Sequence, residues 1–178
     1  ARELHIKEEW ASVEFEEALH LVRVFFERNK NKYNERSWTE CPLNSNIGEY
    51  SFRGYADRID FHPQGIEIVD YKTGKTFIQP RHREWQMGYY AIAARNLGLG
   101  KVYKITLDML KQEKPLEFEV DNDGNAYSSV GDMFFNINQV ESELIEAAED
   151  IVKAYQKGFK PCPIEKNCEF CSEYVYGK

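Results

Sequence analysis

Apolar positions along the chain repeat with helical periods in three segments. Between about residues 12 and 30, apolar side chains recur every three or four positions, as in an amphipathic helix, and the polar run RNKNKYNER closes this segment. The stripe consists of Phe15, Leu19, Val22 and Phe26. A second helix is predicted over RHREWQMGYYAIAARNLGLG, ending at Gly98. A third is predicted over about 129–157, ending at Gly158.

The segments between the helices have the short apolar or alternating patterns of β-strands. A first short strand is expected around SWTECPL, followed by EYSFRGYADRIDF and IEIVDYK, which the turn His62-Pro63-Gln64-Gly65 joins. KVYKITLDML and LEFEV alternate apolar and polar positions and are two further strands. The order of helix, three strands, helix, strands and helix predicts an α/β protein with helices packed on a mixed sheet.

Composition indicates one globular domain over residues 1–178. The chain has 30% charged and 14% aromatic residues, and no apolar run long enough to span a bilayer, so no membrane partner is expected. The N-terminal ARELHIKEEW lacks the features of a secretory signal, which favours a cytoplasmic location. The formal charge of -7 argues against broad attraction to polyanions and leaves room for a local basic patch.

Two acidic residues stand in neighbouring predicted strands on either side of the Pro63-Gln64 turn. Counting outward from a two-residue antiparallel turn places Asp57 directly opposite Asp70. A one-residue bulge at Gly65 would instead put the two carboxylates on opposite faces of the sheet. In a purely structural interpretation, Asp57 pairs with Arg58 and the segment DYKTGK is an ordinary strand end.

Carboxylates that face each other in this register have Cβ atoms about 5 Å apart, and their charges repel unless a proton or a cation lies between them. Lys72 follows Asp70 by two positions and therefore shares its face of the strand. Oxygen ligands suit a hard ion, so the pattern predicts Mg²⁺ or Mn²⁺ held by Asp57 and Asp70. Lys72 would orient or help to deprotonate an attacking water molecule.

The motifs GYADRID and VDYKTGK, followed by Gln86 and Tyr90 in a Q-x-x-x-Y pattern, resemble the RecB-type branch of the PD-(D/E)xK nucleases. This branch includes nuclease domains of helicase-nuclease complexes and CRISPR-associated exonucleases. The resemblance implies a restriction-endonuclease-like core with the order αβββαβ. It also implies a metal-dependent DNA nuclease in which Asp57 and Asp70 bind the metal, the Tyr71 carbonyl adds a ligand and Lys72 is catalytic.

The resemblance also assigns roles to residues on the two helices. Gln86 and Tyr90 are four positions apart on one helix face, where family members shape the site and contact nucleic acid. The alternative is that Tyr90 packs in the core while Gln86 caps nearby backbone. Many family members carry a metal-site histidine on the first helix, and His20 is the candidate here. A solvated surface histidine is the alternative, because the glycine that usually precedes this histidine is missing.

A basic run follows the second aspartate. Four cations and no carboxylate lie in this run, namely Lys72, Lys75, Arg81 and Arg83. The aromatic residues Phe77 and Trp85 lie close by, so the segment is a candidate for holding phosphates and stacking bases. A solvated basic loop is the alternative interpretation.

The C-terminal segment, about 159–178, contains three cysteines with metal-ligand spacing. They are Cys162, Cys168 and Cys171. Some RecB-like nucleases hold an iron-sulfur cluster with C-terminal cysteines and one cysteine from before the first helix. Here the fourth cysteine, Cys41, follows that helix, so either Cys41 completes the set in space or a ligand lies elsewhere. Zinc and ordinary reduced thiols are the alternatives.

Together, these features predict a metal-dependent DNA nuclease that attacks phosphodiesters directly with metal-activated water, as an exonuclease on single strands or DNA ends. Repair, recombination or defence is the expected process, with a helicase or another subunit as a possible partner. The competing hypothesis is a noncatalytic nucleic-acid-binding or scaffold domain within a larger assembly. An enzyme acting on a small phosphorylated molecule is disfavoured, because the chain has no phosphate-cradling glycine loop.

Overall fold

The computed structural model describes residues 8–33, 36–74, 80–130 and 133–158. In chain order, its helices and strands are α1 (Glu8–Asn29), β1 (Ser37–Pro42), β2 (Ser45–Ile47), β3 (Tyr50–Phe52), β4 (Tyr55–His62), β5 (Gly65–Lys72), α2 (Pro80–Asn96), β6 (Val102–Met109), β7 (Leu116–Val120), β8 (Asn125–Ser128), β9 (Phe134–Asn136) and α3 (Ile137–Lys157).

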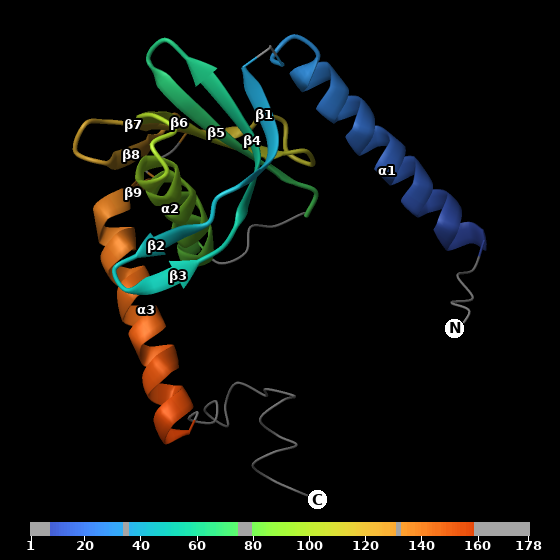
Figure 1. The fold of residues 1–178 in the computed structure, drawn as a ribbon. Helices are drawn as coiled ribbons and strands as arrows, with labels where there is room; N and C mark the ends of the chain where they lie inside the picture. The colour runs from blue at the N-terminus through green and yellow to red at the C-terminus, as the bar shows by residue number, and fades with distance from the viewer. Residues whose placement is uncertain (1–7, 34–35, 75–79, 131–132, 159–178) are drawn as a thin grey trace, which may run out of the picture.

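Seven of the strands form one mixed sheet in the order β1-β4-β5-β6-β7-β8-β9, while β2 and β3 form a separate hairpin. β5 and β6 pair in parallel, and every other neighbouring pair in the sheet is antiparallel. Since parallel neighbours need a crossover connection, α2 lies between them in the chain and packs beside the sheet (Figure 1). The predicted mixed α/β fold is confirmed.

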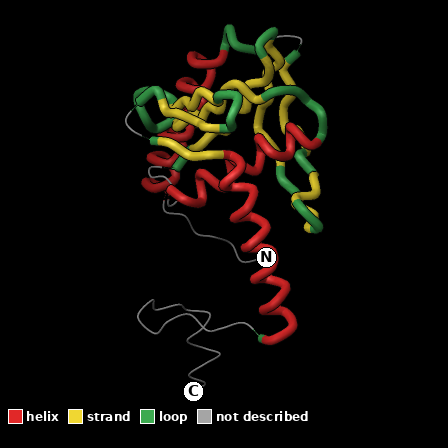
Figure 2. The backbone as a smooth tube through the Cα atoms, turned by 90° about the vertical axis from the view of Figure 1, so that its left-hand side faces the viewer, coloured by secondary structure: helices red, strands yellow, loops and turns green. Residues whose placement is uncertain are grey.

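The hydrophobic core lies between one face of the sheet and α2. Ile68 of β5 and Ile105 of β6 face Met87 and Ile92 of the helix, and all four side chains are fully buried. α3 packs in turn against α2, and both views show its C-terminal part extending beyond the sheet (Figures 1 and 2). The sheet, α2 and α3 therefore form successive layers.

α1 forms over the predicted segment, but its apolar stripe remains largely exposed. Phe15, Val22 and Phe26 are each at least 60% exposed, and the helix stands apart from the sheet along most of its length (Figure 1). Most of its contacts with the rest of the protein lie in the last two turns, where Arg28 forms an ion pair with Asp108 of β6 at 2.6 Å; farther back, Glu17 forms an ion pair with Lys111. Helical periodicity identifies the helix without identifying what covers its apolar face.

Two predicted element boundaries were wrong. The expected strand EYSFRGYADRIDF is broken at Gly54, because the ring of Tyr89 lies against its Cα: a Cβ there would be 2.6 Å from Tyr89 Cε1. The third helix begins at Ile137, not near 129, because β8 and β9 come first. The Asn136 side chain caps this helix by accepting hydrogen bonds from the backbone N–H groups of the second and third residues after it.

The predicted end of α2 at Gly98 is confirmed by its capping geometry. Gly98 has a φ of 68°, and its N–H donates to the carbonyl of Arg95. The N–H of Leu99 donates to the carbonyl of Ala94, which completes the Schellman pattern that favours glycine at this position. The helix therefore ends before β6 begins.

No helix within the described residues is long and apolar enough to cross a membrane.

The contact between α2 and α3 permits a test of the fold. A Cβ at Gly88 would lie 2.5 Å from Cγ1 and 2.8 Å from Cβ of Val140, which is itself buried. We expect Gly88→Ala to lower the free energy of unfolding by about 1–3 kcal/mol, as overpacking of a close contact does. Chemical denaturation would measure this loss.

Val140→Ala and the double variant Gly88→Ala/Val140→Ala complete a double-mutant cycle. Because the smaller side chain removes the closest clash, the double variant should be more stable than the sum of the single losses predicts, by about 0.5–1 kcal/mol. Strict additivity would contradict the packing described here.

Candidate active site

The β4–β5 hairpin determines which side chains share a face of the sheet. Its register runs without a shift from His62 opposite Gly65 to Arg58 opposite Val69. Continued by one position beyond Arg58 and Val69, this register sets Asp57 opposite Asp70. No shift occurs within the paired residues, and Asp70 lies on the face toward α2, where Gln86 contacts it. The charge of Asp57 acts on Asp70, so the two carboxylates are neighbours.

Asp70 is a buried carboxylate with three charged or polar neighbours. It is 2% exposed, Lys72 Nζ lies 2.7 Å from Oδ2, and Gln86 Nε2 donates to Oδ1 at 3.2 Å. Burial raises the pKa of Asp70 above its ordinary value; Lys72 opposes this shift, and the charge of Asp57 adds to it. The site therefore disfavours the negative charge of Asp70 unless additional positive charge is present.

Asp57 is held by the backbone of the facing strand. The N–H of Tyr71 donates to Asp57 Oδ2 at 2.7 Å. Because N–H and C=O of one residue leave an antiparallel strand on the same side, the Tyr71 carbonyl is also directed toward β4. The side chain of Tyr71 lies on the other face, where its hydroxyl donates to Asn29 Oδ1 at 3.1 Å.

Gln86 connects the acidic pair to α2. Its Oε1 accepts a hydrogen bond from Lys72 Nζ at 3.1 Å, and its Nε2 donates both to Asp70 and, at 2.8 Å, to the Tyr90 hydroxyl. Tyr90 is buried in the core, which raises its pKa to about 12. The structural interpretation therefore holds for Tyr90, which packs in the core. It does not hold for Gln86, which forms hydrogen bonds to Asp70 and Lys72 instead of capping backbone.

The structure does not bring His20 to this group. His20 is exposed on α1. That helix reaches the sheet through Phe25, Arg28 and Asn29, and its contacts with Tyr71 lie on the face opposite Asp57 and Asp70. The position of α1 gives His20 no route to the carboxylates in this arrangement.

Two of the predicted phosphate-binding cations are engaged with carboxylates. Arg81 pairs with Glu84 at 3.2 Å and with Glu143 of α3. Arg83 lies 3.8 Å from Glu84 and is largely buried, and burial lowers its pKa. Through Glu143, Arg81 thus connects the start of α2 to α3.

The aromatic residue expected beside the basic run has a similar role. Trp85 is half-buried against the core, and its Nε1 donates to Glu143 Oε2 at 2.7 Å. The predicted contributions of Lys75 and Phe77 lie outside the described residues.

Among the four cysteines, Cys41 is the one that the structure describes. It is buried in the hydrophobic core on β1, and burial raises the pKa of its thiol. Cys162, Cys168 and Cys171 lie outside the described residues, so the predicted cluster or zinc site remains a prediction.

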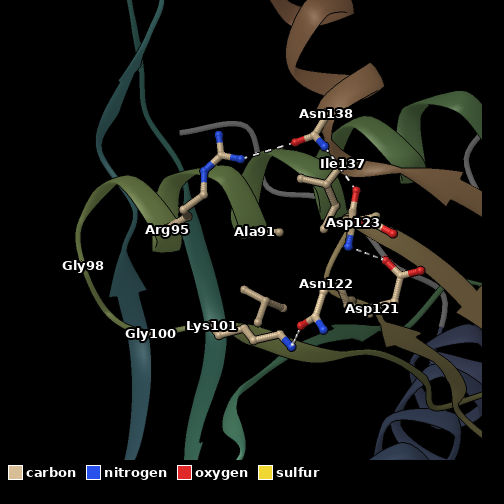
Figure 3. Close-up of a pocket in the computed structure, with 13 residues that line it drawn as sticks. Ala91, Arg95, Gly98, Gly100, Lys101, Asp121, Asn122, Asp123, Ile137 and Asn138 are labelled. Carbon is tan, nitrogen blue, oxygen red and sulfur yellow. Dashed lines mark hydrogen bonds between the residues drawn. The ribbon is translucent and has the colours of Figure 1, made fainter.

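A cavity of about 640 Å³ lies away from the acidic pair, between the end of α2 and the start of α3. Figure 3 shows Arg95 directed toward Asn138, and Lys101 toward Asn122. The cavity borders Val102 at the start of β6, about 13 Å along the strands from the Asp70 level. Its cations Arg95 and Lys101 already have polar partners, and the lining carboxylate of Asp121 accepts hydrogen bonds from the backbone of Asp123 and from Asn125.

One acidic residue near the pair was missed from the sequence. Glu40 on β1 falls between Thr39, opposite Arg58, and Cys41, opposite Ala56, which places it level with Asp57. Its φ of 49° is the one positive value at a non-glycine residue within the described ranges. No local signal in the sequence reveals this conformation, since glutamate rarely adopts it.

The donor set of the acidic pair fits a hard divalent ion. The Asp70 carboxylate is buried and the neighbouring Asp57 is half-buried; burial raises the pKa of Asp70, and the charge of Asp57 adds to this shift. Carboxylate and carbonyl oxygens are the ligands that Mg²⁺ and Mn²⁺ prefer. Asp57 and Asp70 can therefore hold such an ion.

Comparison with known proteins identifies the superfamily of this chain. No similar protein was found among those with curated descriptions. A solved structure titled "Crystal structure of SSO0001" is 18% identical, with a TM-score of 0.43. The match covers 89% of this chain and 66% of that one. The model of the PD-(D/E)XK nuclease superfamily matches residues 1–173. The mixed sheet with flanking helices is consistent with the restriction-endonuclease-like core of that family, and the chain belongs to the PD-(D/E)XK nuclease superfamily.

Proposed function

We propose that the protein is a metal-dependent deoxyribonuclease of the RecB type that hydrolyses phosphodiester bonds with an activated water molecule. The observation that carries this proposal is the facing pair Asp57 and Asp70, with Lys72 and Gln86 bonded to it from the same side of the sheet. Superfamily membership supports a metal-dependent nuclease. The choice of DNA and of Mg²⁺ or Mn²⁺ rests on the oxygen donors and on the motif pattern.

In this proposal, the carboxylates of Asp57 and Asp70 and the backbone carbonyl of Tyr71 would hold the ion. When bound, the ion supplies a Lewis acid that stabilises negative charge and lowers the pKa of a coordinated water molecule. The backbone N–H of Tyr71 keeps one oxygen of Asp57 fixed at 2.7 Å. Its second oxygen is then available as a ligand.

Lys72 and Gln86 have separate roles. Lys72 places an ammonium group beside Asp70, where it can stabilise the extra negative charge of a phosphate in the transition state and orient the attacking water. Gln86 fixes the positions of both side chains through its two amide atoms. Tyr90 holds Gln86 in turn, so it acts as a positioning residue.

The substrate is proposed to be single-stranded DNA or a DNA end, cleaved as an exonuclease in repair, recombination or defence. The motif pattern supports this choice. A phosphate contact by Lys75 belongs to the same proposal and rests on its place in the sequence, three positions after Lys72. An iron-sulfur cluster at the terminal cysteines and a helicase partner belong to the same proposal, because family members of this type combine them.

The central experiment removes the candidate ligands one at a time. We expect Asp70→Asn and Lys72→Ala each to lower Mg²⁺- or Mn²⁺-dependent cleavage of a labelled oligonucleotide by at least about 100-fold, the scale on which one positioned catalytic group acts. Asp150→Asn, an equally conservative change at an exposed position on α3, should leave cleavage unchanged. Circular dichroism would verify that every variant folds.

Two results would contradict the enzyme proposal. Undiminished cleavage by folded Asp70→Asn is one of them. Oligonucleotide binding by the wild-type chain without any cleavage in Mg²⁺ or Mn²⁺ is the other, and it would favour the noncatalytic binding domain.

A second experiment tests the connection through Gln86. Gln86→Ala removes the hydrogen bonds to Asp70 and Lys72 while keeping both residues, so we expect cleavage to fall about 10–100-fold, as with other residues that orient metal ligands. Gln139→Ala, the same change at an exposed position on α3, is the matched control. Equal rates for the two variants would mean that Gln86 does not position the site.

A third experiment uses the raised pKa of Asp70. In a group whose pKa is higher in the folded state, the charged form destabilises the fold, and this cost is absent below the unfolded pKa and complete above the folded one. Without metal, Asp70→Asn should therefore be more stable than the wild type at pH 7. The difference should shrink as pH falls toward the ordinary range of aspartate, about 4.

Urea denaturation in the presence of a chelator would measure this difference. Adding Mn²⁺ should stabilise the wild type and leave Asp70→Asn unchanged, since binding to the folded state alone raises stability. A variant that is less stable than the wild type at pH 7 would show that Asp70 is held mainly by its ion pair with Lys72.

A further inference from the structure

A second group of potential metal ligands lies on the other face of the β4–β5 hairpin, near its turn. Asp60 and His62 are two positions apart on β4 and share a face, and Glu67 on β5 is the cross-strand partner of Asp60. One ligand atom from each residue lies within 4.8 Å of the other two. This face is opposite the one that carries Asp57 and Asp70.

The group contains polar atoms that are buried without a hydrogen-bond partner. Asp60 is 3% exposed, and its Oδ1 accepts no hydrogen bond from any described residue. His62 Nε2 is also buried and lacks a hydrogen bond there. An unsatisfied buried oxygen costs free energy, so two such atoms directed into one acidic group indicate a missing partner.

The distance between His62 and Glu67 indicates that an ion could lie between their side chains. His62 Nε2 and Glu67 Oε2 are 3.9 Å apart, which is too long for a hydrogen bond. Two ligand atoms of one tetrahedral zinc ion, each about 2.0–2.2 Å from it, are about 3.4 Å apart. A shift of roughly half an ångström in the two side chains would bring them to this spacing around an ion.

The other oxygen of each carboxylate already lies beside a cation or a donor. Arg58 forms an ion pair with Asp60, with Nε 3.0 Å from Oδ2. Thr106 donates to Glu67 Oε1 at 2.5 Å, and Lys104 lies 3.5 Å from the same oxygen. These contacts orient the carboxylates as outer-shell partners orient metal ligands, and they leave Asp60 Oδ1 and Glu67 Oε2 for an ion.

We propose that Asp60, His62 and Glu67 bind one divalent ion of borderline character, with Zn²⁺ as the best fit. One imidazole nitrogen and two carboxylate oxygens form a ligand set that Zn²⁺ accepts, and water completes the coordination. Mg²⁺ is a poor fit, because it prefers oxygen ligands in an octahedral shell. The ion would connect the two strands that carry Asp57 and Asp70 on their other face.

The competing explanation is that His62 is protonated and forms an ion pair with Glu67 across 3.9 Å. This pair would need no metal, and it would respond to pH and to salt. It also leaves Asp60 Oδ1 without a partner.

The test observes the ring nitrogens of His62 directly. The chain has four histidines, so a long-range ¹H–¹⁵N spectrum of the chelator-treated full chain contains few imidazole signals, and His62→Gln identifies the one from His62. We expect one equivalent of ZnCl₂ to shift the Nε2 signal of His62. The same concentration of MgCl₂ should leave it in place.

Variants separate this site from the candidate active site and from the cysteines. Asp70→Asn should keep the response of His62 to Zn²⁺, so loss of nuclease activity and loss of this site are distinguishable. Glu67→Gln should raise the Zn²⁺ concentration for half-saturation by about tenfold or more. His82→Gln, at an exposed position on α2, is the matched control and should leave the titration unchanged.

Three outcomes would overturn the proposal. A His62 signal that does not respond to Zn²⁺ would exclude a metal ion at this residue. A Zn²⁺ response that is unchanged in Glu67→Gln would exclude the three-residue site. Binding of Zn²⁺ that leaves the His62 signal unmoved would place the ion elsewhere, for example at the terminal cysteines.

Discussion

The antiparallel register of β4 and β5 is the constraint on which the site depends. A two-residue turn sets which side chains face each other, and here it places one aspartate opposite another next to the hydrophobic core. Such an arrangement is unfavourable for the fold by itself, because burial and like charge both oppose ionisation of Asp70. Unfavourable local electrostatics of this kind is common where a binding site must be ready for a cation.

The two faces of the β4–β5 hairpin carry different polar groups. Toward α2 it presents the acidic pair, which Lys72 and Gln86 surround. On the reverse face, Arg58 donates to Asn29 of α1 at 2.7 Å and lies beside Asp60. Because successive side chains of a strand alternate between faces, a short stretch of sequence carries both polar groups without placing them in contact.

Local features were predictable from the sequence, and features that depend on distant contacts were not. The β4–β5 turn and the end of α2 at Gly98 follow from nearby residues, so both agree with the structure. The break at Gly54 depends on Tyr89, which is 35 positions away in the chain, and no local pattern reveals it. β8 and β9 have only four and three residues, too few to show a clear period.

The candidate site shows the same division. The positions of Asp57, Asp70 and Lys72 relative to one another follow from strand geometry alone. Gln86 contacts both Asp70 and Lys72 because of the way α2 crosses the sheet. The spacing of residues along the helix does not determine that crossing. The ion pairs of Arg81 and Arg83 with Glu84 join residues close in sequence, yet a count of charges treats the two arginines as free for phosphate.

The attachment of α1 at one end has a consequence for local stability. Its last turns are held by Arg28 and Asn29, whereas Phe15 and Val22 are exposed and gain little from packing, and the ion pair of Glu17 with Lys111 between them lies at the surface. A helical segment of up to about 12–15 residues that lacks tertiary packing is marginally stable in water. Backbone amides near Phe15 should therefore exchange their hydrogens through local fraying, long before those of β5, whose exchange requires opening of the whole sheet.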